Sequence, residues 1–296
     1  MSFDERVKQE QEEIEQIIRK FLPKNPTYQK TVVEAMDYSI QAGGKRLRPM
    51  LMRETYRLLG GTGRVIEPFM AAQEMIHTYS LVHDDLPAMD NDRFRRGKET
   101  TWVRYGDGMA VLAGDALLNY AFETALCAFD EDHPDFVPKA VRVLAGKAGV
   151  YGMLGGQVAD VEAEEKELQM TQERLVFIHQ NKTAALLESS MMIGAILAGG
   201  NDTEIAIVEK AARLLGIAFQ IQDDILDIEG NEKELGKPVG SDKRNKKETY
   251  VDFCGMEKAK NDVREMSLQA MELINSLPGK NEFLSDLMKS LINRKK

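Results

Sequence analysis

Two clusters of aspartates contain the side chains in this chain that are best suited to chemistry. Each has two adjacent aspartates followed by a third, and the members are Asp84, Asp85 and Asp90 in the first and Asp223, Asp224 and Asp227 in the second. Asp223 and Asp227 are four positions apart, so on a helix they share one face, where like charges repel. A cation between the carboxylates removes this repulsion, and oxygen ligands without cysteine favour Mg²⁺ over zinc. Because Mg²⁺ also binds phosphate oxygens, the clusters predict a magnesium–phosphate site between two helices.

Basic residues stand close to both clusters and supply groups that bind phosphate. The string GGKRLRP (43–49) places three cations beside two glycines, and further candidates are Arg95, Arg96, Lys182 and Lys237. Arginine binds phosphate oxygens through two nitrogens at once, whereas lysine acts as a point charge. The GGK string lacks the spacing and the Ser/Thr of a phosphate-binding loop of ATPases, which disfavours an ATPase. We therefore predict a diphosphate site.

A simpler alternative is that the acidic pairs only mark helix ends and that the polar stretches 91–106 and 230–248 are solvated loops. Two observations favour the site over this alternative. Each acidic cluster ends an apolar helical segment, and a basic stretch directly follows each of them.

The elements that must position these residues are predicted to be helices. The chain has 296 residues, of which 43% are hydrophobic and 29% charged, which excludes a disordered chain. Apolar residues recur three and four positions apart, as at Ile14, Ile17, Ile18 and Phe21, in roughly ten segments without a linker. The prediction is an all-α fold with a single domain over 1–296. Pro87 should widen or end the helix that carries Asp84, and Asn201 with Glu204 predicts the start of a helix running to about Ile228.

Charge and composition also limit the partners and the compartment. With 39 basic and 48 acidic residues the net charge is −9, which argues against nucleic-acid binding. The charged first twenty residues do not resemble a secretory signal, and the most apolar run, 189–200, is too short to span a membrane. We expect a cytoplasmic protein without stable membrane insertion. Cys127 and Cys254 are expected to be small buried apolar residues without a disulfide.

Five motifs together resemble one enzyme family. GGKRLRP, HDDLPAMDNDRFRRGKETT, GGQVAD, NKT and FQIQDDILD, which lie between Gly43 and Lys247, are similar in identity and order to those of the trans-prenyltransferases, the isoprenyl diphosphate synthases. The spacing inside DDLPAMD resembles the bacterial short-chain branch, that of the farnesyl diphosphate synthases. The resemblance implies helices around a deep central cavity, Mg²⁺ as cofactor, isopentenyl and allylic diphosphates as substrates, and a homodimer.

The resemblance also implies a role for each motif residue. Mg²⁺ would be held by the aspartates of both clusters. The allylic diphosphate would be bound by Arg95, Lys182 and Lys237, and isopentenyl diphosphate by Lys45, Arg48, His77 and Arg96. Thr183 and Gln220 would lie near the developing allylic cation, so the catalytic set is Lys182, Thr183, Gln220 and Lys237.

Tyr79 and Ser80, which precede the first cluster, are candidates for setting product length. Tyr79 lies five positions before Asp84, about 140° away around an ideal helix, whereas Ser80 lies closer to the Asp84 face. This geometry alone does not make Tyr79 the end of the cavity. In the family, however, an aromatic residue at this position accompanies a C15 product, which favours farnesyl diphosphate made from dimethylallyl or geranyl diphosphate.

Several alternatives remain at this point. A geranylgeranyl diphosphate synthase of the same family is the nearest one. A terpene cyclase is disfavoured because DDILDIEG lacks the Ser/Thr of the second cyclase metal motif, and an inactive partner subunit because both aspartate clusters are present. The pair Glu74 and His77 suggests a di-iron helical bundle, but such a site needs a second Glu-x-x-His motif, which the chain lacks.

Overall fold

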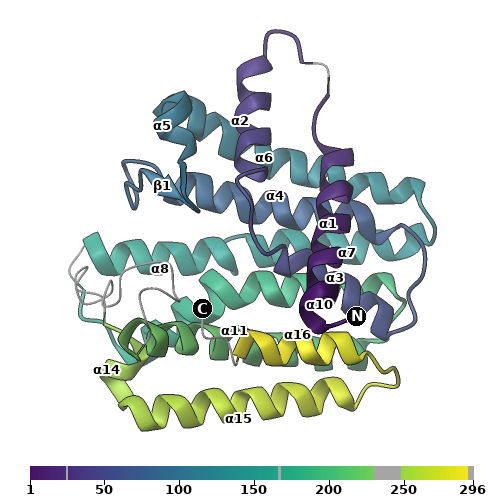
Figure 1. Ribbon diagram of the computed structural model, residues 1–296, viewed down its shortest axis with the longest axis vertical. Coiled ribbons are helices and arrows are strands. Elements are labelled where there is room, and N and C mark those ends of the chain that lie inside the picture. The colour runs from purple at the N-terminus through teal and green to yellow at the C-terminus, as the bar shows by residue number, and fades with distance from the viewer. Residues whose placement is uncertain (25, 166–167, 230–247, 293–296) are drawn as a thin grey trace.

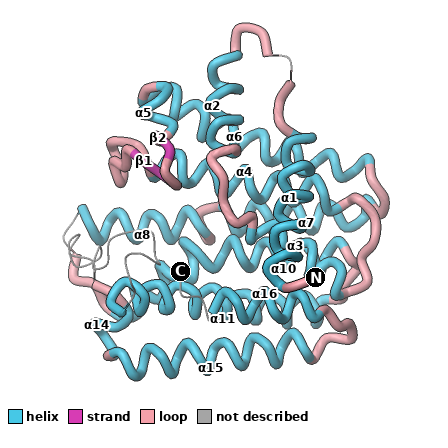
Figure 2. Tube along the Cα trace, viewed as in Figure 1, coloured by secondary structure: helices cyan, strands magenta, loops and turns pink. Residues whose placement is uncertain are grey.

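The fold is helical from end to end in the part that the computed structural model describes, residues 1–24, 26–165, 168–229 and 248–292. The first half contains α1 (Phe3–Phe21), α2 (Lys30–Ile40), α3 (Leu47–Leu58), α4 (Ile66–Asp84), strands β1 (Phe94–Arg95) and β2 (Lys98–Glu99), α5 (Thr101–Tyr105) and α6 (Asp107–Leu126). The predicted all-α class is confirmed: Figure 2 shows helices throughout, with β1 and β2 as the only strands among the described residues.

Shorter helical turns separate the longer helices in the second half. The elements are the 3₁₀ turns η1 (Cys127–Asp130) and η2 (Pro134–Phe136), α7 (Val137–Ala148), α8 (Met153–Glu165), α9 (Gln172–Ile178), the π-helical segment η3 (His179–Ala184), α10 (Ala185–Leu197), α11 (Asp202–Glu229), α14 (Tyr250–Cys254), α15 (Met256–Asn275) and α16 (Glu282–Ile292). In Figure 1, α2 and α5 lie at the top of the molecule and α14 and α15 at the bottom.

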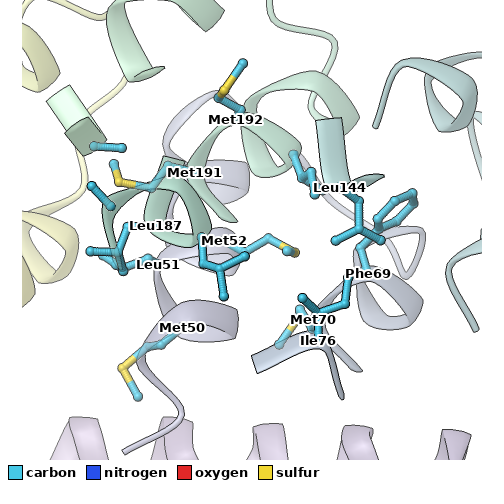
Figure 3. Close-up of a cluster of buried hydrophobic side chains, with 14 of the residues drawn as sticks. Met50, Leu51, Met52, Phe69, Met70, Ile76, Leu144, Leu187, Met191 and Met192 are labelled. Atoms are coloured by element: carbon cyan, nitrogen blue, oxygen red, sulfur yellow. The ribbon is translucent and has the colours of Figure 1, made fainter. Parts of the chain in front are cut away.

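Helix α10 is the centre of the core. All of its side chains are buried, and it contacts α3, α4, α7 and α11. Most of these side chains are apolar, and such a helix is stable only when other helices surround it. Figure 3 shows Met191 and Met192 of α10 near Met52 of α3, in a cluster of buried apolar side chains. This core fixes the helices that carry the functional residues.

Two predicted helix boundaries are confirmed, and local chemistry explains both. Helix α4 ends at Asp84, three residues before Pro87. At the start of α11, the Asn201 side chain accepts hydrogen bonds from the amides of Thr203 and Glu204, both at 3.0 Å. The Glu204 carboxylate in turn accepts from the Asn201 amide at 2.9 Å, which completes a reciprocal cap.

The alternative of a plain loop over 91–106 was wrong, and so was the expected burial of the two cysteines. The stretch 91–106 is not a plain loop: Arg96 and Gly97 adopt positive φ angles of 53° and 75° and turn β1 back onto β2, and α5 follows. The cysteines are free but are not buried, because Cys127 is exposed at the end of α6 and Cys254 is half-buried at the end of α14. The second basic stretch, 230–248, lies outside the described residues except for Glu248.

The length and apolar character of the helices decide whether any of them could span a bilayer. No helix in the described ranges is both long enough and apolar enough to cross a membrane. The apolar run around 189–200 belongs to α10, which the core buries.

Close packing between α10 and α3 gives a prediction about stability. A Cβ atom on Gly194 of α10 would collide with the backbone of Met52 and Tyr56 in α3. We expect Gly194→Ala to lower the free energy of unfolding by about 1–3 kcal/mol, because the two backbones must separate. Gly146→Ala in α7, where a Cβ meets nothing within 4 Å, is the control and should be neutral or stabilising by up to about 1 kcal/mol. Denaturant unfolding measures both, and equal stabilities of the two variants would contradict this packing.

Candidate active site

The first aspartate cluster forms where α4 ends. Asp84 is the last residue of the helix, and Asp85 caps it. The chain then turns sharply, so that the amide of Asp90 donates to the carbonyl of Asp84 at 2.8 Å. This turn places Asp90 beside Asp84 although the two are six positions apart. The structure therefore brings the backbones of Asp84, Asp85 and Asp90 together at the end of α4.

Partners from two other elements orient these carboxylates. Arg95 of β1 donates to Oδ1 of Asp85 from Nε at 2.7 Å and lies 2.6 Å from it through a terminal nitrogen. Gln157 of α8 donates to Oδ1 of Asp84 at 2.9 Å. Arg95, which was expected to contact a diphosphate, is thus paired with Asp85 in this structure.

The charges of the first cluster are only partly compensated. Burial raises the pKa of Asp84 to about 6, with the negative charges of Asp90 and Asp85 adding to the rise and Lys182 and Arg95 opposing it. Burial also raises the pKa of Asp85, against the effect of Arg95. An added cation would stabilise the ionised forms of both carboxyl groups. The oxygen-only donor set therefore fits Mg²⁺.

The second cluster lies on α11, as its spacing predicted. Asp227 is buried, and Asp223 and Asp224 are half-buried. Asp224 accepts a hydrogen bond from the amide of Tyr250 at 2.8 Å, and its carboxylate lies 3.9 Å from Nε2 of His179. Burial lowers the pKa of His179 to about 4, so this histidine is neutral near pH 7.

The π-helical segment η3 lies between α8 and α11 and carries Lys182 and Thr183. A Cβ atom on Gly156 of α8 would collide with the backbone of Lys182, so this glycine allows α8 to approach η3 closely. At this contact Asp160 of α8 pairs with Nζ of Lys182 at 2.6 Å. A π-helical turn is a frequent feature of functional sites.

Gln157 and Asp160 are site residues that the sequence interpretation did not assign. Both belong to GGQVAD, a motif that contributed to the resemblance but received no role for its residues. The available signal was the pair of glycines directly before Gln157, because adjacent glycines inside a helix indicate a close contact with another backbone.

Basic residues from three elements gather near His77 of α4, which lines the same cavity as Asp84. Arg48 of α3 is half-buried, and its Nε has no hydrogen-bond partner among the described residues. Burial lowers the pKa of Arg48 to about 10, and Glu74 opposes this shift while Arg96 adds to it. Burial lowers the pKa of His77 well below 6.5, with Arg48 and Arg96 contributing. The cluster therefore has a surplus of positive charge that suits an anion.

Lys45 and Arg46, which are adjacent in GGKRLRP, have opposite surroundings. Lys45 is exposed at the start of α3, whereas Arg46 is buried against Glu74. On the outer side, a terminal nitrogen of Arg96 donates to the carbonyl of Gly43. Arg48 and Arg96 thus lie near His77, and Lys45 stands exposed at the same end of α3.

One cavity of about 450 Å³ is lined by Asp84 of the first cluster and by Arg48 and His77 of the basic group, whereas the second aspartate cluster is not part of its lining. Its polar lining comprises Arg48, His77, Ser80, His83, Asp84, Gln157, Lys182 and Thr183, and its apolar lining includes Tyr79, Leu81, Leu86, Val111, Met153, Leu154 and Leu186. Both candidates for product length, Tyr79 and Ser80, line it, and the Tyr79 ring meets the His83 ring edge to face at 5.8 Å. Gln220 lies on α11 and is not part of this lining. Lys237 lies outside the described residues.

No carboxylate cluster is a complete metal cage by itself. Within the described ranges, no three or more acidic, histidine or cysteine side chains come together closely enough to hold an ion alone. This is compatible with Mg²⁺, which takes one or two protein carboxylates and completes its coordination with water and substrate phosphates.

Comparisons with known proteins identify the family of the chain. The chain is 48% identical over 228 residues to a farnesyl diphosphate synthase of Geobacillus stearothermophilus, covering 77% of this chain and 76% of the relative. It is 41% identical over 282 residues to a geranylgeranyl diphosphate synthase of Cyanophora paradoxa, covering 95% and 93%. The fold matches that of a geranyltransferase of Helicobacter pylori, solved in complex with magnesium and isoprenyl diphosphate, with a TM-score of 0.81, 29% identity and coverage of 99% and 97%.

The family model of the polyprenyl synthetases matches residues 29–285. This range includes every motif on which the resemblance was based, from GGKRLRP to FQIQDDILD. The resemblance is confirmed, and the chain belongs to the polyprenyl synthetase family.

Proposed function

We propose that this chain is a magnesium-dependent prenyltransferase that condenses isopentenyl diphosphate with dimethylallyl or geranyl diphosphate to give farnesyl diphosphate and pyrophosphate. The observation that carries the proposal is the cavity itself. It has the Asp84 carboxylate at the end of α4, an Arg48 nitrogen without a hydrogen-bond partner among the described residues, and a largely apolar remaining lining. We take residues 1–296 as a single polyprenyl synthase domain.

The acidic half of the cavity would bind the allylic substrate. Asp84, Asp85, Asp90, Asp223, Asp224 and Asp227 would hold Mg²⁺, which when bound neutralises the charge of the allylic diphosphate. Lys182, Arg95 and Lys237 would contact the same diphosphate and stabilise the departing pyrophosphate as the allylic C–O bond breaks. Asp160 and Asp85 would keep Lys182 and Arg95 in place until the substrate binds.

The basic half would bind isopentenyl diphosphate through Lys45, Arg48, His77 and Arg96. His77 is neutral near pH 7 because its pKa is lowered, so it would donate a hydrogen bond rather than a charge. The double bond of this substrate would attack the allylic cation, forming the new C–C bond, and pyrophosphate would accept the released proton. Thr183 and Gln220 would lie near the cation, and the apolar lining would keep water away from it.

A geranylgeranyl product is the second candidate, because the relative from Cyanophora paradoxa has that name. Tyr79 favours the C15 product. It is 7% exposed and fills part of the cavity lining between α4 and α6, where a longer chain would need space.

The proposal extends to a cytoplasmic homodimer that does not bind nucleic acid. Support for a dimer comes from apolar side chains that continue the cavity lining to the surface. Val111 of α6 and Leu154 of α8 line the cavity and are 41% and 42% exposed, and Leu112, the residue after Val111 in α6, is 54% exposed. Exposed apolar groups in such a patch are typical of protein interfaces.

The experiment that tests the function is a product assay with the purified chain. Isopentenyl diphosphate is supplied with dimethylallyl, geranyl or farnesyl diphosphate in turn, and the products are separated by chain length. The first two substrates should give C15 as the main product, and farnesyl diphosphate should be extended poorly. Cyclic hydrocarbons, or no condensation with any of the three, would refute the proposal.

Loss of the metal or of a carboxylate should abolish turnover. We expect EDTA, or Asp84→Ala, to lower turnover by at least about a hundredfold, since strong stabilisation of the leaving group is lost. Asp286→Ala is the control, because Asp286 is exposed on α16 and pairs only with Lys289 among the contacts described. Near-normal turnover in EDTA would contradict a role for Mg²⁺.

Tyr79 should limit product length by its volume. Tyr79→Ala removes the ring and deepens the cavity, so the products should shift from C15 toward C20 and longer. Tyr79→Phe keeps the ring and is the control, with C15 still expected. If the alanine variant still stops at C15, another part of the lining limits the chain.

The proposed homodimer can be tested by the mass of the particle in solution. Light scattering should give twice the chain mass of 33.3 kDa, and Leu112→Glu should shift the protein toward monomers because it places a charge in the exposed apolar patch. A wild-type protein that is monomeric at micromolar concentration would refute the homodimer.

A further inference from the structure

Glu74 is a buried carboxylate on α4 that has no role in the proposed mechanism. It is 2% exposed and lies one helical turn before His77. Its Oε1 is 2.8 Å from a terminal nitrogen of Arg46, and both side chains are 3% exposed. A buried carboxylate is costly unless a cation compensates it, so this pair is a fixed point in the structure.

Arg46 makes a second contact that fixes the backbone between α2 and α3. Its other terminal nitrogen donates to the carbonyl of Ile40, the last residue of α2, at 2.6 Å. Arg46 itself has the left-handed φ angle of 49° directly before α3. Few side chains adopt this conformation without strain, so tertiary contacts must hold it. The contacts of Arg46 with Glu74 and Ile40 supply that support.

The position of Arg46 determines where its neighbours in sequence point. Lys45 precedes it and is exposed, and Arg48 follows it and lines the cavity. With Arg46 held inward by Glu74, the backbone between Lys45 and Arg48 can take only a narrow range of orientations. Arg96, in the turn between β1 and β2, is tied to the same segment, because its side chain donates to the carbonyl of Gly43.

Glu74 also supplies negative charge to the arginine cluster as a whole. Burial lowers the pKa of both Arg48 and Arg96, and the charge of Glu74 is the largest influence that opposes each shift. Glu15 also faces Arg46, at 3.7 Å from its Nε, but its side chain is 32% exposed and therefore better screened by water. Glu74 is thus the buried counter-charge common to Arg46, Arg48 and Arg96.

We propose that Glu74 is a positioning residue that holds Arg46, and through it Lys45 and Arg48, ready for isopentenyl diphosphate. It therefore sets the affinity for this substrate and leaves the affinity for the allylic diphosphate nearly unchanged. The proposal rests on the proposed function, since it assigns Lys45, Arg48, His77 and Arg96 to isopentenyl diphosphate.

Glu74 affects the binding of the diphosphate in two opposite ways. Its negative charge repels the diphosphate, so removal of the charge alone would tighten binding. Removal also leaves Arg46 as a buried cation without its closest partner, which is the more costly effect. Arg46 must then turn outward, and the Lys45–Arg48 segment must move with it. Loss of position therefore dominates, and binding should weaken.

The test is Glu74→Gln with Glu188→Gln as a matched control. Glu188 is also 2% exposed and accepts from Nε of Arg213 at 2.9 Å, but it does not line the cavity. Steady-state kinetics should show that Glu74→Gln raises KM for isopentenyl diphosphate by about tenfold or more, the scale on which residues that orient a binding group act. KM for geranyl diphosphate and kcat should stay within about twofold of wild type. Glu188→Gln should change neither KM.

Three results would overturn the proposal. They are an unchanged KM for isopentenyl diphosphate, a lowered one, or an equal rise in both KM values. If Glu74→Gln fails to fold, Arg46→Met with Glu74→Gln removes both buried charges and should restore folding. That double variant should still have the raised KM, because the contact that fixes the segment is gone, and a wild-type KM would overturn the proposal as well.

Failure of the proposed function would be visible separately. A wild-type chain that makes no prenyl product would refute the function, and calorimetry with inorganic pyrophosphate in EDTA would then decide the role of Glu74. Weaker pyrophosphate binding by Glu74→Gln than by wild type and Glu188→Gln supports the role. Equal binding by all three proteins overturns it.

Discussion

The burial of charged groups at one cavity is the constraint that the rest of this structure must satisfy. Asp84 at the end of α4 and Arg48 of α3 both line this cavity, and both are half-buried. Burial raises the pKa of Asp84 to about 6 and lowers that of Arg48 to about 10, and a like charge nearby adds to each shift. A complex of a cation with a diphosphate carries both signs of charge, so it would relieve the strain on both sides. The helical frame must hold the groups in place until such a ligand binds.

The frame achieves this with a rigid centre and with partners for individual side chains. Helix α10 is buried on every side and fixes α3, α4 and α11 around it, so the groups on these helices cannot drift apart. Gly156 lets α8 touch η3, which places Asp160 at Lys182 and Gln157 at Asp84. The partners differ in charge. Asp84 accepts a hydrogen bond from the neutral amide of Gln157, whereas the buried Arg46 forms an ion pair with Glu74.

Residue spacing was sufficient to predict the aspartate clusters, the end of α4 before Pro87 and the cap that begins α11, because these features depend on contacts within a few residues. It could not rank Tyr79 against Ser80, since an ideal helix gives angles but not the width of the cavity, which both residues line. The inward direction of Arg46 and the contacts of Gln157 depend on helices distant in sequence. The exposure of Cys127 likewise follows from how the end of α6 meets the surface, which composition does not encode.

The central claim is that the carboxylates of the cavity bind an allylic diphosphate together with Mg²⁺. The most direct measurement is the dissociation constant of geranyl diphosphate for the wild-type chain, without isopentenyl diphosphate, in Mg²⁺ and in EDTA. Because a bound cation attracts the diphosphate and each ligand strengthens the other's binding equally, geranyl diphosphate should bind at least about tenfold more tightly in Mg²⁺. The same dissociation constant under both conditions would contradict the account.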